Sequence, residues 1–414
     1  MNQDSLIYDW NELPGCFDYS SVTVELNDET LRDGLQNPSV VDPPIEKKIE
    51  LLHIMADLGI HAADIGLPGA GLRAYEAVRA LGKEILDANL PIAPTAAART
   101  VCSDIEPIVR IQQEIGVQFE VATFIGSSPI RQYVEGWDVE HILTATHDAV
   151  TFAVDEGLDV MYVTEDTTRS RPETLTKLFT TAIEAGANRL CLADTVGHAT
   201  PYGVRQLIRF TRDLVEQSGE PVKIDWHGHR DRGFGLANVL AVIEEGVDRV
   251  HGTALGIGER IGNVEMDLLL VNLHLLGTHD HPIDRLAEYC ALTAHMCEIE
   301  VPHNYPVVGK DAFRTGTGVH AAAIIKAMEK GDHWLEDCVY SGVPASLVGR
   351  SQSIEVSPVS GLSNVRYWLS EHGYDQEDME LCNAVFGLAK SCDHTLSEEE
   401  IESEIERFTA NTTL

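Results

Sequence analysis

The sequence predicts an α/β protein: a parallel (β/α)8 TIM barrel followed by a smaller, mostly helical C-terminal region. Eight β-then-α units recur along the chain at a spacing of roughly 30 residues. Nearly every candidate functional residue falls where a predicted strand ends, and these ends form the face on which such barrels build their active sites. An open doubly wound sheet is the alternative, but it would usually carry a glycine-rich phosphate loop, and the sequence has no clear one.

The predicted elements follow from the hydrophobic pattern. Short β-rich runs predict strands at 22–26, 61–66, 91–98, 117–122, 158–163, 189–193, 222–226 and 249–253. Amphipathic periodicity predicts helices at 45–58, 72–88, 105–115, 139–156, 172–185, 201–216, 236–245 and 264–276. Beyond about residue 277 the pattern changes to turns and helices, ending in an acidic helix at 397–408. We therefore assign the barrel, with its N-terminal lead, to 1–280 and a helical linker or lid region to 281–414.

The composition argues against several classes of partner and location. The 414 residues include 66 acidic and 30 basic side chains, and the net charge of −36 makes nucleic acid and anionic membranes improbable partners. No apolar run approaches the roughly 20 residues that a membrane helix needs, and the N-terminus does not resemble a secretory signal. The eight cysteines are scattered without a C-x-x-C pair, as expected for reduced thiols in a cytoplasmic protein.

Two histidines at the end of the seventh strand indicate a metal site. Side chains two apart on a strand share a face, so His227 and His229 would point together into the barrel. With the carboxylate of Asp33 and the amide oxygen of Asn263 from the same rim, they would suit Mg²⁺, Mn²⁺ or Zn²⁺. The alternative interpretation is that one histidine is a core residue and the other faces solvent.

Arginines at the rim bear on the kind of substrate. Arg32, always charged, would polarise a carbonyl and stabilise a developing alkoxide next to the ion. Because the whole chain is strongly negative, an anionic substrate would need local positive charge, which the metal and the rim arginines could supply. These arginines are Arg32, Arg169, Arg230, Arg232 and Arg260.

Five blocks of sequence carry a resemblance to one family. They lie at 30–34, 165–169, 194–197, 227–229 and 258–263, in order along the chain. Together they resemble the 2-isopropylmalate synthase/homocitrate synthase family of the DRE-TIM metallolyase superfamily. The resemblance covers about residues 22–276 and resumes at 309–349. It implies an acyltransferase that condenses acetyl-CoA with a 2-oxo acid and then hydrolyses the thioester to release CoA.

The resemblance also implies roles for single residues. Asp33, His227, His229 and Asn263 would hold the metal. Arg32 would contact the keto oxygen, Thr195 the substrate carboxylate, and Glu165 would belong to the catalytic group. Substrate binding is further assigned to Gln36, Asp64 and Arg169. His320 would act as acid/base in a partner subunit's site, which implies a homodimer, and Tyr340 matches a family tyrosine although its spacing to Pro344 differs.

Departures from the family pattern leave specific questions. The acid after the second strand is Asp64 instead of glutamate, which puts its pairing with Arg32 in question. Arg131 stands where the family often has histidine, and Arg230 and Arg232 follow the histidine pair. The extra arginines and the short chain favour a dicarboxylic acceptor such as oxaloacetate or 2-oxoglutarate. The alternative is that these arginines pair with the acidic surface, which is the expected fate of at least one of them. The chain ends where feedback-regulated isopropylmalate synthases continue, so no regulatory domain is expected.

Two other functions stay open. Residues 32–37 resemble hydroxymethylglutaryl-CoA lyase better than the synthases, which would make the protein a carbon–carbon lyase. Residues 258–263 and 318–320 are synthase-like and favour the condensing enzyme. A third possibility is a catalytically inactive barrel that binds metal or a metabolite. It would require that an essential residue is missing, and Asp64 is the one candidate for that.

Overall fold

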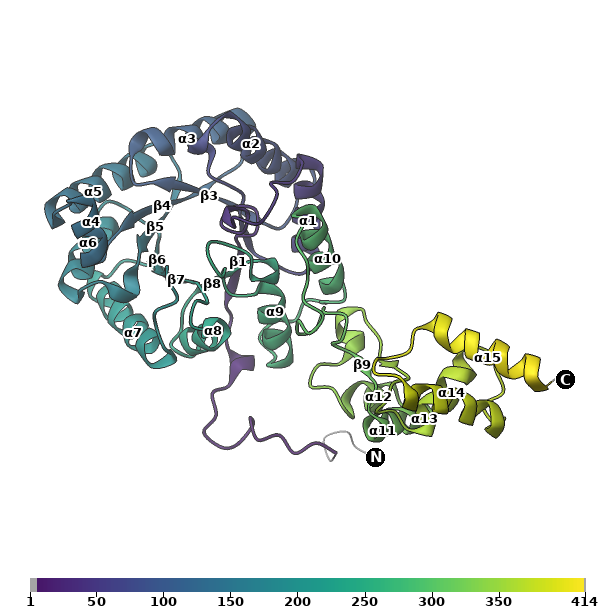
Figure 1. The fold of residues 1–414 in the computed structure, drawn as a ribbon. Coiled ribbons are helices and arrows are strands. Elements are labelled where there is room, and N and C mark those ends of the chain that lie inside the picture. Colours follow the sequence, from purple (N-terminus) through teal and green to yellow (C-terminus); the bar gives the residue numbers. More distant parts are fainter. Residues whose placement is uncertain (1–5, 413–414) are drawn as a thin grey trace. The chain divides into compact units, whose positions relative to one another are not determined.

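The computed structural model describes residues 6–412 and contains a closed barrel of eight parallel strands (Figure 1). Each strand pairs with its sequence neighbours, and β8 closes the ring on β1. The strands are β1 (Glu25–Asp28), β2 (Ala62–Asp64), β3 (Ala93–Arg99), β4 (Glu120–Gly126), β5 (Asp159–Glu165), β6 (Arg189–Asp194), β7 (Lys223–Gly228) and β8 (Arg249–Gly252). The predicted TIM barrel is confirmed.

Helices surround the strands on the outside of the ring (Figure 1). They are α1 (Ile45–Asp57), α2 (Leu72–Asp87), α3 (Cys102–Ile115), α4 (Pro129–Glu135), α5 (Val139–Asp155), α6 (Pro172–Glu184), α7 (Pro201–Ser218), α8 (Gly235–Glu244), α9 (Met266–Leu275) and α10 (Leu286–Met296). Their buried faces pack on the barrel, as periodic apolar residues require. Within the described part of the chain, no helix combines the length and apolarity needed to span a bilayer.

Some boundaries differ from those that the sequence predicts. The first strand begins at Glu25 instead of residue 22, because a short 3-10 helix, Tyr19–Ser21, capped by Asp18, precedes it. The fourth begins at Glu120 instead of residue 117, since the Phe119 backbone N–H donates to the Gln112 side chain at 2.8 Å. The short helix α4 was not expected. Apolar pattern alone does not separate buried loop residues from strand residues.

The lower interior of the barrel is a network of paired charges. Asp225, fully buried on β7, accepts from Arg189 at 2.8 Å and from Arg249 at 2.6 Å. Both arginines also contact Glu120. These buried charges are tolerated because each is paired and hydrogen-bonded. The network fills the end of the barrel away from the carboxyl rim, so a cavity can form only toward the rim.

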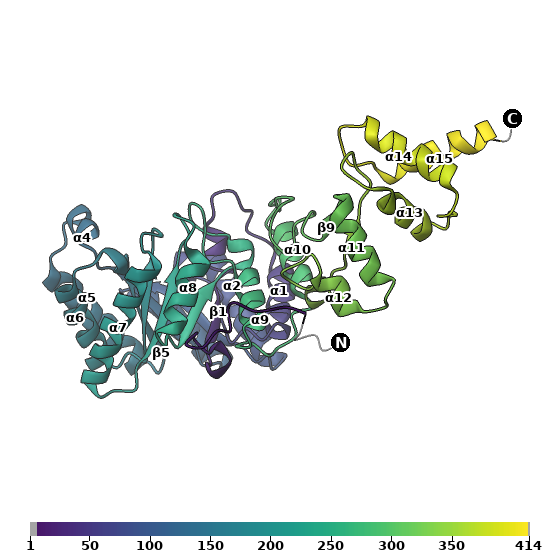
Figure 2. The same ribbon diagram turned by 90° about the horizontal axis from the view of Figure 1, so that it is seen from below.

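The chain divides into two compact units. Of the described residues, one unit comprises 6–282 and 288–299, and the other comprises 283–287 and 300–412. The second unit contains a two-stranded parallel pair and a set of helices (Figure 2). These elements are β9 (Arg314–Thr315), α11 (Gly318–Met328), α12 (His333–Cys338), β10 (Ser353–Ile354), α13 (Leu362–Glu371), α14 (Met379–Ser391) and α15 (Glu398–Thr412).

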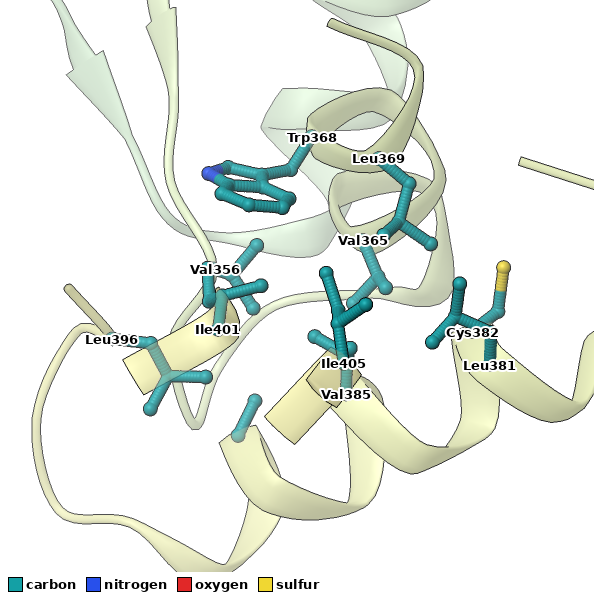
Figure 3. Packing of buried hydrophobic residues seen from close by; sticks show 11 residues of the cluster. Val356, Val365, Trp368, Leu369, Leu381, Cys382, Val385, Leu396, Ile401 and Ile405 are labelled. Atoms are coloured by element: carbon teal, nitrogen blue, oxygen red, sulfur yellow. The ribbon is translucent and has the colours of Figure 1, made fainter. Parts of the chain in front are cut away.

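The second unit has a hydrophobic core of its own, formed by α13, α14 and α15 (Figure 3). Val365, Leu369 and Val385 are fully buried in it, and Ile401 and Ile405 of α15 pack from the other side. The predicted acidic helix at 397–408 is therefore amphipathic: its acidic face is exposed and its apolar face belongs to this core.

Replacing Leu369 by alanine should destabilise this core. The side chain is fully buried, so its loss leaves a cavity and costs about 2–5 kcal/mol. Thermal unfolding followed by near-ultraviolet circular dichroism, which reports on Trp368 and Tyr374, should show a lower midpoint. Leu275→Ala, at a half-exposed leucine of α9, is the control and should change little. Equal loss in both variants would contradict the assignment of the core.

Candidate active site at the carboxyl end of the barrel

The segment after β1 turns so that two neighbouring side chains reach the barrel mouth. The backbone N–H groups of Arg32 and Gly34 both donate to the Glu29 carbonyl, which folds the chain back over the strand end. A 3-10 turn, Gly34–Gln36, follows directly. In an extended chain Arg32 and Asp33 would face opposite ways, and this turn brings both to the site.

Asp33, His227 and His229 meet as the sequence predicts. The Nε2 atoms of His227 and His229 lie 3.4 and 3.5 Å from Asp33 Oδ2, and all three side chains are buried. Burial alone would raise the pKa of Asp33, but Arg32 and the two imidazoles hold it well below its usual range. One carboxylate oxygen and two imidazole nitrogens therefore converge on one space, as a divalent cation requires.

Asn263 lies beside this triad. It forms an isolated antiparallel bridge with His229, and its Nδ2 donates to the Ile257 carbonyl at 3.2 Å. Its Oδ1 is buried and has no donor among residues 6–412. A buried oxygen without a donor is costly unless a ligand satisfies it, so the residues present fit a bound cation.

The loop that carries Asn263 depends on a glycine. Gly262 has φ +96°, and a Cβ there would lie 1.8 Å from the Gly256 carbonyl oxygen. The loop can therefore fold against itself only with glycine at this position. Arg260, in the same loop, reaches Asp231 at 2.9 Å and the Thr195 carbonyl at 2.6 Å.

Arg32 is held by three carboxylates. Its Nε donates to Asp64 Oδ2 at 2.8 Å, its Nη1 lies 3.6 Å from Asp33, and its Nη2 contacts Glu29. The pairing of Arg32 with Asp64, left in question by the shorter acid, is thus made. Burial raises the pKa of Asp64 to about 6, against the opposing charge of Arg32. This cage fixes the guanidinium beside the triad.

Glu29 and His251 belong to the site although the sequence analysis did not select them. Glu29 Oε1 accepts from His227 Nδ1 at 3.3 Å and from His251 Nδ1 at 2.6 Å. His251 Nε2 in turn donates to Asp225 at 3.1 Å. For His251 the signal was present as a period of two: Asp225 and His227 alternate on the seventh strand, with His229 just beyond its end, and Arg249 and His251 alternate on the eighth.

A cavity of about 230 Å³ opens above these groups within the barrel unit. Its lining includes the predicted residues Arg32, Asp33, Gln36, Glu165, Thr195, His227 and His229, together with Glu29, His251 and Arg260. Burial raises the pKa of the Glu165 carboxyl above its usual value, although Arg131, 3.2 Å away, limits the rise. Thr195 Oγ1 accepts from the Asp166 backbone N–H at 2.8 Å, which fixes its side chain at the rim.

Most of the extra arginines are engaged by acidic or carbonyl partners. Arg169 makes a bidentate contact with Asp166 at 2.7 and 2.8 Å and does not line the cavity. Arg131, Arg230 and Arg232 do not line it either. Their partners are Glu135 and Glu165 for Arg131, Glu265 for Arg230, and the His198 carbonyl for Arg232.

His320 and Tyr340 belong to the second unit. His320 lies in the first turn of α11, and its ring stacks on that of Tyr340 with centroids 4.2 Å apart and planes 26° apart. Both side chains are exposed. The two residues were selected separately from the sequence, and the structure places their rings in contact.

The HMGL-like family model matches residues 23–293, which is most of the barrel unit. The chain is 32% identical over 354 residues to a homocitrate synthase of Methanopyrus kandleri, covering 85% of this chain and 83% of that one. It is 31% identical over 371 residues to a 2-isopropylmalate synthase of Sulfolobus acidocaldarius, covering 89% and 90%.

Among solved structures, an HMG-CoA lyase of Bacillus subtilis has the same fold. The TM-score is 0.56 at 19% identity, and the match covers 68% of this chain and 95% of the lyase. The sequence matches and the five signature blocks agree with one another. The chain therefore belongs to the HMGL-like family, within the DRE-TIM metallolyase superfamily that its signature blocks resemble.

Proposed function

We propose that the protein is a metal-dependent acyltransferase that condenses acetyl-CoA with a 2-oxo acid and releases CoA. The observation that carries the proposal is the Asp33, His227 and His229 triad placed beside the caged Arg32 at the mouth of a cavity. The names of two relatives, a homocitrate synthase and a 2-isopropylmalate synthase, support the same class of reaction.

In this proposal Asp33, His227, His229 and Asn263 hold a divalent cation, Mg²⁺, Mn²⁺ or Zn²⁺. When bound, the cation supplies Lewis acidity at the carbonyl of the acceptor. Arg32 donates to the keto oxygen and stabilises the negative charge that develops there. Thr195 and Gln36, both in the cavity wall, orient the acceptor's carboxylate.

The carbon–carbon bond forms between the acetyl methyl carbon and the keto carbon of the acceptor. The methyl group is a weak acid, so a placed base must take its proton as the bond forms. We assign acid/base roles to His320, with Tyr340 stacked on it, and to Glu165 at the rim. The keto oxygen gains a proton, and water then cleaves the thioester to give the free acid and CoA.

The direct test is release of free thiol from acetyl-CoA by the purified protein with Mn²⁺ and a panel of 2-oxo acids. Thiol release that depends on the acceptor and stops with a chelator would support the proposal. The rival carbon–carbon lyase would instead cleave 3-hydroxy-3-methylglutaryl-CoA. Cleavage without condensation would overturn the proposal in favour of the lyase, and inactivity in both assays would favour a binding protein.

Glu29 should strengthen the binding of the proposed cation. Its carboxylate accepts from His227 Nδ1, which leaves Nε2 free to face the cation. In Glu29→Gln the charge is lost, and the affinity for Mn²⁺ should fall about 10- to 100-fold. Electron paramagnetic resonance of free Mn²⁺ measures the affinity, and nitrogen NMR of the metal-free protein reports the His227 tautomer.

The matched control is Glu120→Gln. Glu120 is also a carboxylate inside the barrel that contacts arginines, but its partners are Arg189 and Arg249 of the lower network. This variant should keep the wild-type Mn²⁺ affinity even if it unfolds at lower temperature. An unchanged affinity in Glu29→Gln would show that Glu29 serves only the packing of the barrel.

A further inference from the structure

The cavity at the barrel mouth has two unlike halves. The half formed by β7, β8, β1 and their loops is polar and carries Arg32, Asp33, His227, His229 and Arg260. The half formed by β3 to β6 is lined by Ala97, Ala122, Phe124, Met161, Val163 and Cys191, which we call the apolar wall. Because β7-β8-β1 and β3 to β6 are each contiguous in the closed barrel, the two halves face each other.

The register of the strands makes the apolar wall continuous. Ala97 pairs with Ala122, and Ala122 pairs with Met161, across three neighbouring strands. Val163 connects Phe124 on one side with Cys191 on the other. The two alanines are small, so the wall leaves room beside them for a substituent of the substrate. The wall therefore presents an uninterrupted apolar surface to the cavity.

The charges that face this cavity do not suit a second carboxylate over the wall. Among the described residues that line it, cationic side chains come from the polar half alone. There Arg32 already contacts three carboxylates, and Arg260 is paired with Asp231. The ionisable group that closes the wall at the rim is Glu165, an acid. A carboxylate buried here would lack a partner, which is strongly unfavourable.

We propose that the acceptor is a 2-oxo acid whose substituent on the keto carbon is an uncharged alkyl group. The inference rests on the proposed function, in which the carboxylate and keto oxygens of the acceptor face the cation and Arg32. The substituent on the keto carbon then extends away from the polar half, over the apolar wall. Burying an alkyl group against the apolar wall lowers the free energy of the complex. A dicarboxylic acceptor would instead lose the hydration of its second carboxylate, which raises that free energy. This revises the dicarboxylic preference drawn from the rim arginines.

The test compares acceptors of matched shape. In 4-methyl-2-oxopentanoate an isopropyl group replaces the distal carboxylate of oxaloacetate, and 5-methyl-2-oxohexanoate is matched in the same way to 2-oxoglutarate. We expect kcat/KM for thiol release to be at least about 100-fold higher for the alkyl member of each pair. Calorimetric binding of each acceptor to the Mn²⁺-loaded protein, without acetyl-CoA, should give the same order.

Failure of this inference is distinguishable from failure of the proposed function. Thiol release with a dicarboxylic acceptor at equal or higher efficiency would overturn the alkyl assignment and leave the condensing reaction standing. Alkyl-selective binding without any thiol release would overturn the proposed condensing reaction, while it would support the apolar wall as the surface that binds the alkyl substituent. Absence of binding for every member of the panel would overturn the assignment of this cavity as the acceptor site.

A variant tests the wall itself. Ala122→Leu adds bulk next to Met161, so the efficiency for 4-methyl-2-oxopentanoate should fall at least about 10-fold relative to pyruvate. The Mn²⁺ affinity of the same variant, which depends on the polar half, should stay at the wild-type value and shows that the barrel is folded. An unchanged ratio of the two acceptors in a variant that binds Mn²⁺ would overturn the proposal.

Discussion

Replacing Asp33 by asparagine should reduce kcat/KM for thiol release by at least about 1,000-fold, equivalent to about 4 kcal/mol of transition-state stabilisation. Among residues 6–412, Asp33 is the one carboxylate that contacts both His227 and His229. It therefore supplies the negative charge that two neutral imidazoles cannot provide to a divalent ion. The affinity for Mn²⁺, measured by calorimetry, should fall with the rate. Excess Mn²⁺ should restore little activity, because the neutral amide lacks the negative charge of the one carboxylate in the ligand set.

Asp64→Asn is the matched control for this variant. Asp64 is equally buried and also contacts Arg32, but it belongs to β2 and, within the described part of the chain, forms neither a hydrogen bond nor an ion pair with His227 or His229. Its replacement should disturb Arg32 and lower the rate while the Mn²⁺ affinity stays close to that of the wild type. Equal loss of Mn²⁺ affinity in both variants would contradict the assignment of Asp33 as the ligand.

The second large effect is expected at His320. His320→Ala should lower kcat by about 100- to 10,000-fold, the range that general acid–base groups contribute, without changing the Mn²⁺ affinity. His320 is exposed on α11 and stacks on Tyr340, so its removal costs no core packing. His333→Ala, at an exposed histidine of the neighbouring α12, is the control and should keep full activity. A fully active His320→Ala protein would remove this residue from the mechanism.

Mixing variants tests the proposed homodimer. If His320 acts in the partner's barrel, refolding equal amounts of Asp33→Asn and His320→Ala together should restore about a quarter of wild-type activity, because each mixed dimer gains one intact site. If His320 acts within its own chain, no mixed dimer has an intact site and the mixture stays inactive. Sedimentation of the wild type as a fully active monomer would also defeat the shared site.

The fold was predictable because eight units each give the same local signal. Strands such as β5 and β6 are buried runs of apolar residues, and the following helices show an apolar stripe. Each β-then-α unit can therefore be predicted from its own stretch of sequence. The triad was predictable for a related reason. His227 and His229 share a face by strand geometry, and parallel strands of a barrel bring their carboxyl ends to one rim, where Asp33 also lies.

The parts that escaped prediction depend on partners that are distant in sequence. Glu29 could not be distinguished from a solvated acid until β7 and β8 placed His227 and His251 around it. The number of arginines at the rim suggested binding capacity for anions, but Arg169 is paired by an acid three residues away. Charge composition gives the number of ionic groups, whereas their pairing depends on the three-dimensional arrangement.

The separation of the cavity into a polar and an apolar half also bears on how members of such a family could diverge. Residues of β7, β8 and β1 would fix the chemistry, and residues of β3 to β6 would face the variable part of the acceptor. Substitutions at Ala97, Ala122 or Met161 could then accumulate without touching an ion ligand. Gene duplication followed by change on this one side of the barrel would be a short evolutionary route from one product to another.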